Sequence, residues 1–105
     1  GMVMNRATEE WADQQIQDAL KVLSDHHARE WEARRVEREA YIRRQIADWQ
    51  HHLAGCLERA ASYEAEAATL PRSHKHCSQL LRNAADQRDK AAYARSHIAI
   101  LEGGI

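Results

Sequence analysis

The sequence predicts an all-α fold, an antiparallel long helical hairpin with an N-terminal helical extension that forms a bundle or coiled-coil-like dimer. Three observations predict this fold. The chain of 105 residues has only 4 Gly, 1 Pro and no Phe, a composition typical of helical bundles. No glycine or proline lies between Met2 and Ala54. Apolar residues recur at alternating intervals of four and three in two segments that Pro71 separates, which is the pattern of two helices packed along one seam.

The first helical part is expected over residues 6–39, as an extension of the hairpin. Asn5 or Thr8 suits the start of a helix, and Glu9 and Glu10 in the first turn interact favourably with the helix dipole. The extension has an apolar stripe of its own, which does not keep phase with the seam of the hairpin. This stripe consists of Ala12, Ile16, Leu20, Leu23, His27 and Trp31.

The path of the chain near Ser24 and Asp25 has two interpretations. Either these residues cap a second helix after a bend, or one long helix crosses them with a shift of its apolar face. We favour the long helix because no glycine or proline marks a turn. A helix over residues 6–69 would span about 95 Å, which a single chain of this size could hardly cover. The sequence therefore predicts a homodimer or a higher homo-oligomer.

The hairpin has three expected parts, which are residues 40–69, a turn at residues 70–73 and a final helix at residues 73–102. The residue before a proline is pushed out of the helical region, so the first arm should stop near Leu70 and Pro71. Ser73 can cap the final helix, and Gly103 and Gly104 follow its end. All of these parts belong to one helical domain over residues 1–105.

Each arm carries one apolar seam with heptad spacing. The seam of the first arm is Ile42, Ile46, Trp49, Leu53, Cys56, Ala60, Tyr63, Ala67 and Leu70. The seam of the final helix is Cys77, Leu80, Ala84, Gln87, Ala91, Ala94, Ile98 and Leu101. If Leu70 meets Cys77 across the turn, large side chains tend to face small ones, as close packing requires. The pairs that follow are Ala67 with Leu80, Tyr63 with Ala84, Leu53 with Ala94 and Trp49 with Ile98.

A second apolar stripe beside each seam predicts a bundle of three or more helices. The stripe residues are Ala47, Ala54, Leu57, Ala61 and Ala68 on the first arm, and Leu81, Ala85, Ala92 and Ala99 on the final helix. The additional helices would be the N-terminal segment folded back or the hairpin of a second subunit. Trp11 and Trp31 flank the N-terminal stripe, where they would either fill a core or anchor a partner. We expect self-association through Ile16, Leu20, Leu23, Trp31, Ile42, Ile46 and Trp49.

The net charge of −1 provides no overall field that favours nucleic acid or an anionic membrane. Two basic and five acidic side chains give residues 1–25 a charge of −3, whereas six basic and two acidic ones give residues 72–95 a charge of +4. These two segments could attract each other within a bundle or between subunits. Between them, acidic and basic residues alternate, and Glu30 with Arg34 forms a favourable i, i+4 pair.

A histidine-rich stretch raises the question of a metal site. Asp48, His52 and Cys56 lie at i, i+4 and i+8 on one helix face, and eight residues rise about 12 Å. Donors that share a zinc ion lie within about 4 Å of each other, so these three cannot bind one ion. A three-ligand site would instead take His52 with Cys56, or Asp48 with His52, and add His97 from the opposite arm. Because the seam already explains Cys56 as a small buried hydrophobe, we expect no metal and no cofactor.

The final helix carries the best candidate for a phosphate-binding face, since Tyr93 lies among basic residues. These basic residues are Arg82, Arg88, Lys90 and Arg95. The acidic N-terminal segment can neutralise this face in the folded protein, so nucleic acid is not the expected partner.

The function expected from these patterns is protein–protein interaction or assembly, as an adaptor or chaperone-like helical bundle without catalytic activity. The sequence has no Gly-rich phosphate loop and no nucleophile elbow. A nucleic-acid-associated helical protein is the first alternative, and a metal-binding bundle is the second. Two cysteines are too few for a disulfide framework, and no signal segment or long apolar run is present. We therefore expect a cytoplasmic protein that does not enter a membrane and that binds itself or another helical protein.

Overall fold

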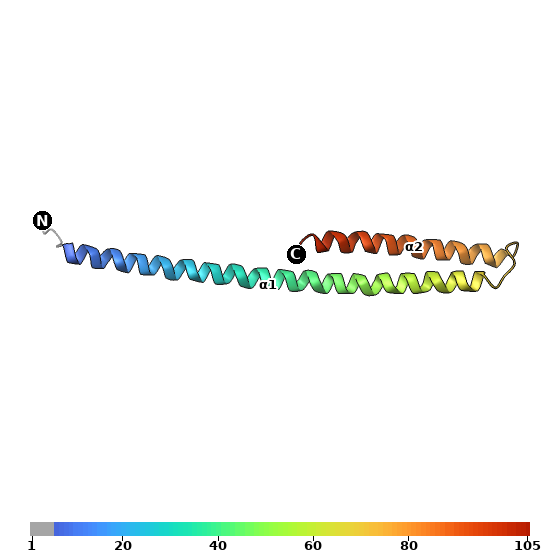
Figure 1. Ribbon diagram of the computed structural model, residues 1–105, viewed down its shortest axis with the longest axis horizontal. Coiled ribbons are helices and arrows are strands. Elements are labelled where there is room, and N and C mark those ends of the chain that lie inside the picture. The colour runs from blue at the N-terminus through green and yellow to red at the C-terminus, as the bar shows by residue number, and fades with distance from the viewer. Residues whose placement is uncertain (1–5) are drawn as a thin grey trace. The chain divides into compact units, whose positions relative to one another are not determined.

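The computed structural model describes residues 6–105, which form two α-helices and no strand. Helix α1 covers Arg6–Ala67 and helix α2 covers Lys75–Glu102 (Figure 1). The predicted all-α hairpin is thereby confirmed. The chain divides into two units, which we call the N-terminal unit (residues 6–38 of the described part) and the hairpin unit (Glu39–Ile105). The expectation that both belong to one domain stays a prediction.

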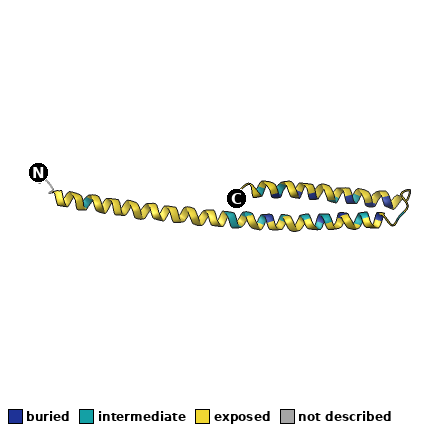
Figure 2. Cartoon of the chain, viewed as in Figure 1, coloured by how far each residue is buried: buried dark blue, intermediate teal, exposed yellow. Residues whose placement is uncertain are grey.

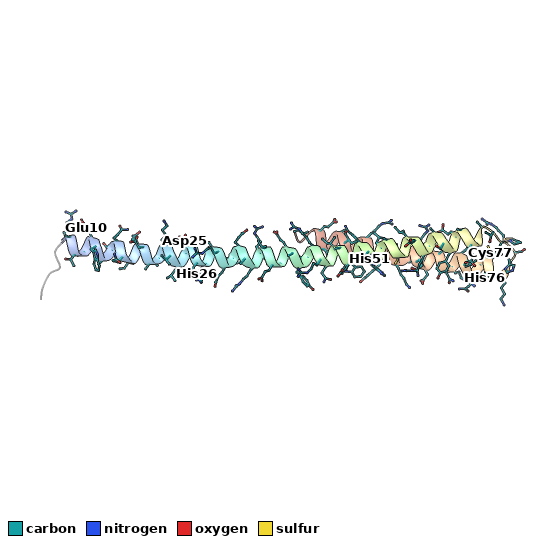
Figure 3. The ribbon with its side chains drawn as sticks, turned by 90° about the horizontal axis from the view of Figure 1, so that it is seen from below. Glu10, Asp25, His26, His51, His76 and Cys77 are labelled. Carbon is teal, nitrogen blue, oxygen red and sulfur yellow. The ribbon has the colours of Figure 1, made fainter. Side chains whose placement is uncertain are left out.

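Helix α1 continues through Ser24 and Asp25, so the long helix is confirmed and the bend is not observed. Figure 3 shows Asp25 and the neighbouring His26 on an unbroken helix. Residues with high helix propensity dominate this stretch, and neither glycine nor proline interrupts it. Side-chain contacts between successive turns add support. They join Arg6 to Glu10 at 3.3 Å, Gln14 to Asp18 at 2.9 Å and His26 to Glu30 at 3.2 Å.

In the hairpin unit, α2 packs antiparallel against α1, and the buried residues of the two helices face each other (Figures 1 and 2). Every residue of the two predicted seams is buried or half-buried, so both seams are confirmed. Small side chains occupy the most deeply buried positions, where the helices approach closely. These are Cys56, Ala60 and Ala94, which are fully buried, and Ala91, which is 1% exposed.

Two contacts across the hairpin follow the predicted register to within one residue. The Nε of Arg59 donates a hydrogen bond to Oε1 of Gln87 at 3.0 Å, one residue before the position that the register pairs with it. The ring centroids of Trp49 and His97 lie 4.5 Å apart, one residue before the predicted partner Ile98. The arms are therefore aligned as expected, with a small shift toward the turn.

The core is best closed at the turn end of the hairpin. Ala67, Cys77 and Leu80 form a buried cluster, and Tyr63 and Leu70 pack against it. The expected pairing of Ala67 with Leu80 is observed in this cluster. The Cys77 thiol also lies 3.7 Å from the carbonyl oxygen of Ala67, the last residue of α1. The turn is thus held by side chains of both arms.

The N-cap of α2 is His74, and the expectation that Ser73 caps this helix is wrong. His74 has an extended backbone, with φ −69° and ψ 129°, and its Nδ1 accepts a hydrogen bond from the N–H of His76 at 3.1 Å. The N–H of His74 is itself bound to the carbonyl oxygen of Pro71 at 2.9 Å. Because the turn after Pro71 holds His74 in this conformation, α2 begins at Lys75 rather than at residue 73.

Helix α2 ends at Glu102, as expected, beside the start of the hairpin's first arm. The N–H of Gly104 donates to the carbonyl oxygen of Leu101 at 3.0 Å. A Cβ on Gly104 would lie 3.4 Å from Cδ1 of Ile42, which is ordinary van der Waals contact, so this residue lies against the first seam position. The end of α2 therefore lies beside Ile42, the residue at which the heptad pattern of the first arm begins.

Replacing Leu80 by Ala should lower the free energy of unfolding by about 2–4 kcal/mol, because the side chain is 3% exposed and its removal leaves a cavity in the turn cluster. The matched control is Leu81→Ala, which makes the same chemical change at a side chain that is 46% exposed. Urea unfolding followed by circular dichroism compares the two. Equal losses in both variants would contradict the described core.

Candidate functional site

The N-terminal unit has a row of large apolar side chains on its surface. Ile16, Leu20, Leu23 and Trp31 are exposed by 58%, 60%, 55% and 69%. No residue between positions 6 and 38 is buried, and Ala12 alone is half-buried (Figure 2). Helices usually owe most of their stability to the packing of an apolar face, and this face has no cover among the described residues. We call the residues Ala12, Ile16, Leu20, Leu23, His27 and Trp31 the N-terminal stripe.

Other exposed apolar residues of this unit lie on a different side of the helix. At about 100° per residue, Trp11 lies about 140° around the axis from Ile16, and Val22 lies about 120° from it. Trp11 and Val22 are exposed by 65% and 64%. Trp31 therefore continues the stripe, whereas Trp11 does not, although the sequence reading placed both tryptophans at its edges.

Some charged side chains of the N-terminal unit interact with neighbours on the same helix. Glu30 contacts Nε2 of His26 at 3.2 Å instead of pairing with Arg34 as the sequence predicts. Arg35 donates from Nε to Glu32 at 3.0 Å, and this hydrogen bond, opposed by slight desolvation and aided by the positive charge of Arg35, lowers the pKa of Glu32. These pairs hold charged side chains along the helix surface and leave the apolar stripe open.

Three of the expected self-association residues are used within the hairpin unit instead. Ile46 is 9% exposed in the core, and Ile42 and Trp49 are half-buried along the seam. Their apolar surface is therefore largely covered by the same chain. Of the seven expected residues, Ile16, Leu20, Leu23 and Trp31 remain exposed.

The hairpin unit also has an open apolar face. Leu81 is 46% exposed, Leu57 is half-buried, and the alanines of the second stripes are exposed. These alanines are Ala47, Ala54, Ala61, Ala68, Ala85, Ala92 and Ala99. The face is made of small side chains, so it offers less apolar area per residue than the N-terminal stripe.

The three metal-ligand candidates do not converge. Nε2 of His52 lies 3.7 Å from the thiol of Cys56, whereas the ring of Trp49 lies against His97. The guanidinium of Arg59 also donates to the Cys56 thiol at 3.6 Å, which places a positive charge where a metal cation would bind. Among the described residues, no group of three or more His, Cys, Asp or Glu side chains has the geometry of a metal site.

The same region contains an aromatic cluster that the sequence reading missed. The ring of Trp49 lies 5.8 Å from Tyr93 and 5.7 Å from His52, in edge-to-face contacts, and Tyr93 stacks on His97 at 6.1 Å. The i, i+4 spacing of Tyr93 and His97 was the available signal. An open hollow of about 480 Å³ beside the cluster is lined by Trp49, His52, Asp89, Lys90 and Tyr93.

The basic face of α2 is partly neutralised by its own neighbours. Arg88 donates to Glu64 of α1 at 2.6 Å, and Lys90 lies 3.6 Å from Asp86. Arg82 is bound to the side-chain oxygen of Gln79 at 3.0 Å. Among the described residues, Arg88 and Lys90 therefore each have an ion pair, and Arg82 and Arg95 have none.

The histidines at the turn have structural contacts. His74 caps α2, and Nε2 of His76 lies 3.6 Å from the carboxylate of Glu66 on α1. Figure 3 places His76 and Cys77 together at this end of the hairpin. Cys77 is buried, like Cys56, and both thiols are free. The turn histidines thus help to hold the two arms together.

Neither helix of the described chain has a stretch that is both long and apolar enough to cross a membrane. In comparisons with protein families, curated proteins and solved structures, the sequence has no match in any of the three. The functional argument therefore depends on the surfaces of the two units, and the N-terminal stripe brings four exposed large apolar side chains to one side of a helix.

The ring contacts of Tyr93 should contribute measurably to the stability of the hairpin unit. Tyr93→Ala should lower the free energy of unfolding by about 0.5–1.5 kcal/mol more than Tyr41→Ala. The two tyrosines are similarly exposed, by 64% and 56%, but only Tyr93 has ring contacts among the described residues. Urea unfolding measures the difference, and equal effects would contradict a stabilising aromatic cluster.

Proposed function

We propose that the protein is an assembly module, without catalytic activity, that associates with itself through the N-terminal stripe as a homodimer or a higher homo-oligomer. The observation that carries this proposal is the exposure of Ile16, Leu20, Leu23 and Trp31 along one side of the helical N-terminal unit, which has no buried residue between positions 6 and 38. An adaptor or chaperone-like role fits the same surface, because a helical partner would bind it by its own apolar face.

The free energy gained by burying the apolar side chains of the stripe is comparable to the free-energy cost of association. Full burial of one Leu, Ile or aromatic side chain contributes about 1.5–3 kcal/mol, and a symmetric dimer buries each stripe residue twice. Association costs about 4–15 kcal/mol in lost freedom of motion. Several large side chains from each copy are therefore required, and the stripe supplies four from each chain.

The cytoplasm is the compartment that fits this module best. Cys56 and Cys77 are free and buried in the seam, where each acts as a small apolar side chain. Reduced thiols of this kind are typical of proteins in a reducing compartment. The proposal includes no metal ion or organic cofactor, since the packing of the stripe requires neither.

Leu20→Glu should weaken self-association at least about tenfold, because the dimer would have to bury two carboxylates in place of two leucines. The matched control is Val22→Glu, which adds the same charge to the same unit, at a residue that is 64% exposed and lies off the stripe. The absolute mass is measured by light scattering after gel filtration, over a range of concentrations, in reducing buffer with a chelator.

The wild-type protein and Val22→Glu should have a mass of at least twice 12.1 kDa, and Leu20→Glu should shift toward the mass of one chain. A wild-type mass of 12.1 kDa at all concentrations would refute self-association. Equal effects of the two variants would show that the stripe is not the contact surface. Circular dichroism of each variant checks that the hairpin unit is still folded.

A further inference from the structure

We infer that the N-terminal stripe pairs in antiparallel orientation with the same stripe of a second copy, about a two-fold axis that passes between Lys21 and Val22. This inference rests on the proposed function, because it specifies how the self-association occurs. The occupant of the exposed face is thus a second copy of the chain. Four properties of the stripe support this arrangement. They are its spacing, the sizes of its side chains, its charges and its exposure.

The spacing of the stripe is the same when it is read from either end. Extended by the charged residue on the same side at each end, the stripe is Glu9, Ala12, Ile16, Leu20, Leu23, His27, Trp31 and Arg34. The successive intervals are three, four, four, three, four, four and three residues, a palindrome. In an antiparallel pair, each stripe residue of one copy then lies at the same position along the pair axis as a stripe residue of the other copy, that is, level with it. A two-fold symmetric interface requires this correspondence.

The stripe also repeats every eleven residues, which keeps it on one side of a nearly straight helix. Ala12 is followed by Leu23, Ile16 by His27, and Leu20 by Trp31 at this interval. An eleven-residue repeat corresponds to about 3.67 residues per turn, close to the 3.6 of a regular helix. Two such helices can therefore remain in contact along the whole stripe without strong supercoiling.

The sizes of the side chains fit the antiparallel pairing. Leu20 lies level with Leu23 of the second copy, so four leucines meet at the centre of the pair. Ala12 lies level with Trp31 of the second copy, where the small side chain leaves room for the indole. A parallel pair in register would instead place Trp31 beside Trp31 and Ala12 beside Ala12, which crowds one end and leaves a gap at the other.

The charges at the ends of the stripe favour the same orientation. Glu9 of one copy lies level with Arg34 of the other, and the symmetry produces this contact twice. Neither residue has an ion pair within the described chain, and Glu30, the predicted partner of Arg34, contacts His26 instead. In a parallel pair in register, Glu9 would face Glu9 and Arg34 would face Arg34, and both contacts would be repulsive.

Distances between spin labels on the two copies test the orientation directly. Val22→Cys and Ala33→Cys place a nitroxide at two exposed positions off the stripe. These positions are one eleven-residue repeat apart, so they share one side of the helix. Cys56 and Cys77 are buried, and labelling of the wild-type protein serves as the control for their protection.

Antiparallel pairing predicts a short distance at position 22 and a much longer one at position 33. Residue 33 of one copy would be level with residue 10 of the other. The two labels at position 33 would therefore be about 35 Å apart along the helix axis. Equal distances at both positions, in a protein with the mass of two chains, would show parallel pairing and overturn this inference while the proposed self-association stands. A protein with the mass of one chain would overturn both.

Charge reversal provides a second test that does not depend on labels. Glu9→Arg and Arg34→Glu should each raise the dissociation constant about two- to tenfold, because each creates two like-charged contacts. The double variant should restore the wild-type affinity, since every contact is then again between opposite charges. If the loss of binding free energy in the double variant equals the sum of the losses in the two single variants, the predicted contact between Glu9 and Arg34 is contradicted.

Discussion

Close packing between α1 and α2 along the heptad seams is the interaction on which the hairpin unit depends. Cys56, Ala60 and Ala94 are fully buried at the centre of this contact, so the two backbones approach each other closely. Larger residues fill the ends, with Leu80 in the turn cluster and Ile46 at the opposite end. Every buried residue of the described chain lies in one of the two seams, and the polar contacts between Arg88 and Glu64 or Arg59 and Gln87 flank them on the surface.

The same constraint explains why the N-terminal unit is exposed. An apolar helix face is stable only when another element covers it, and α2 ends at Glu102, beside the first seam residue Ile42. The apolar pattern changes between the units, from a repeat of seven residues in the hairpin unit to one of eleven in the N-terminal unit. The seven-residue pattern suits the contact between α1 and α2. The eleven-residue pattern suits the contact that we propose with another copy of the chain.

Periodicity predicted the seams, the antiparallel arms and the continuity of α1, because heptad spacing and the absence of helix breakers are properties of the sequence itself. Features that depend on three-dimensional detail were missed. The backbone after Pro71 determines that His74, not Ser73, caps α2. The one-residue shift of the register places Trp49 against His97, and this contact assembles the aromatic cluster with Tyr93. The seam residue Ile46 was assigned to self-association because periodicity does not distinguish contacts within a chain from contacts between chains.

The uneven distribution of buried residues has a consequence for folding. The hairpin unit contains the entire described core, so its helices can form at any protein concentration. The described N-terminal unit has no buried residue, so its helix depends on the propensity of its residues and on contacts between successive turns rather than on packing. Its amide hydrogens should therefore exchange with solvent faster than those around Ala60 and Ala91, and the proposed association would slow this exchange. Concentration would then regulate how strongly this unit is protected from exchange.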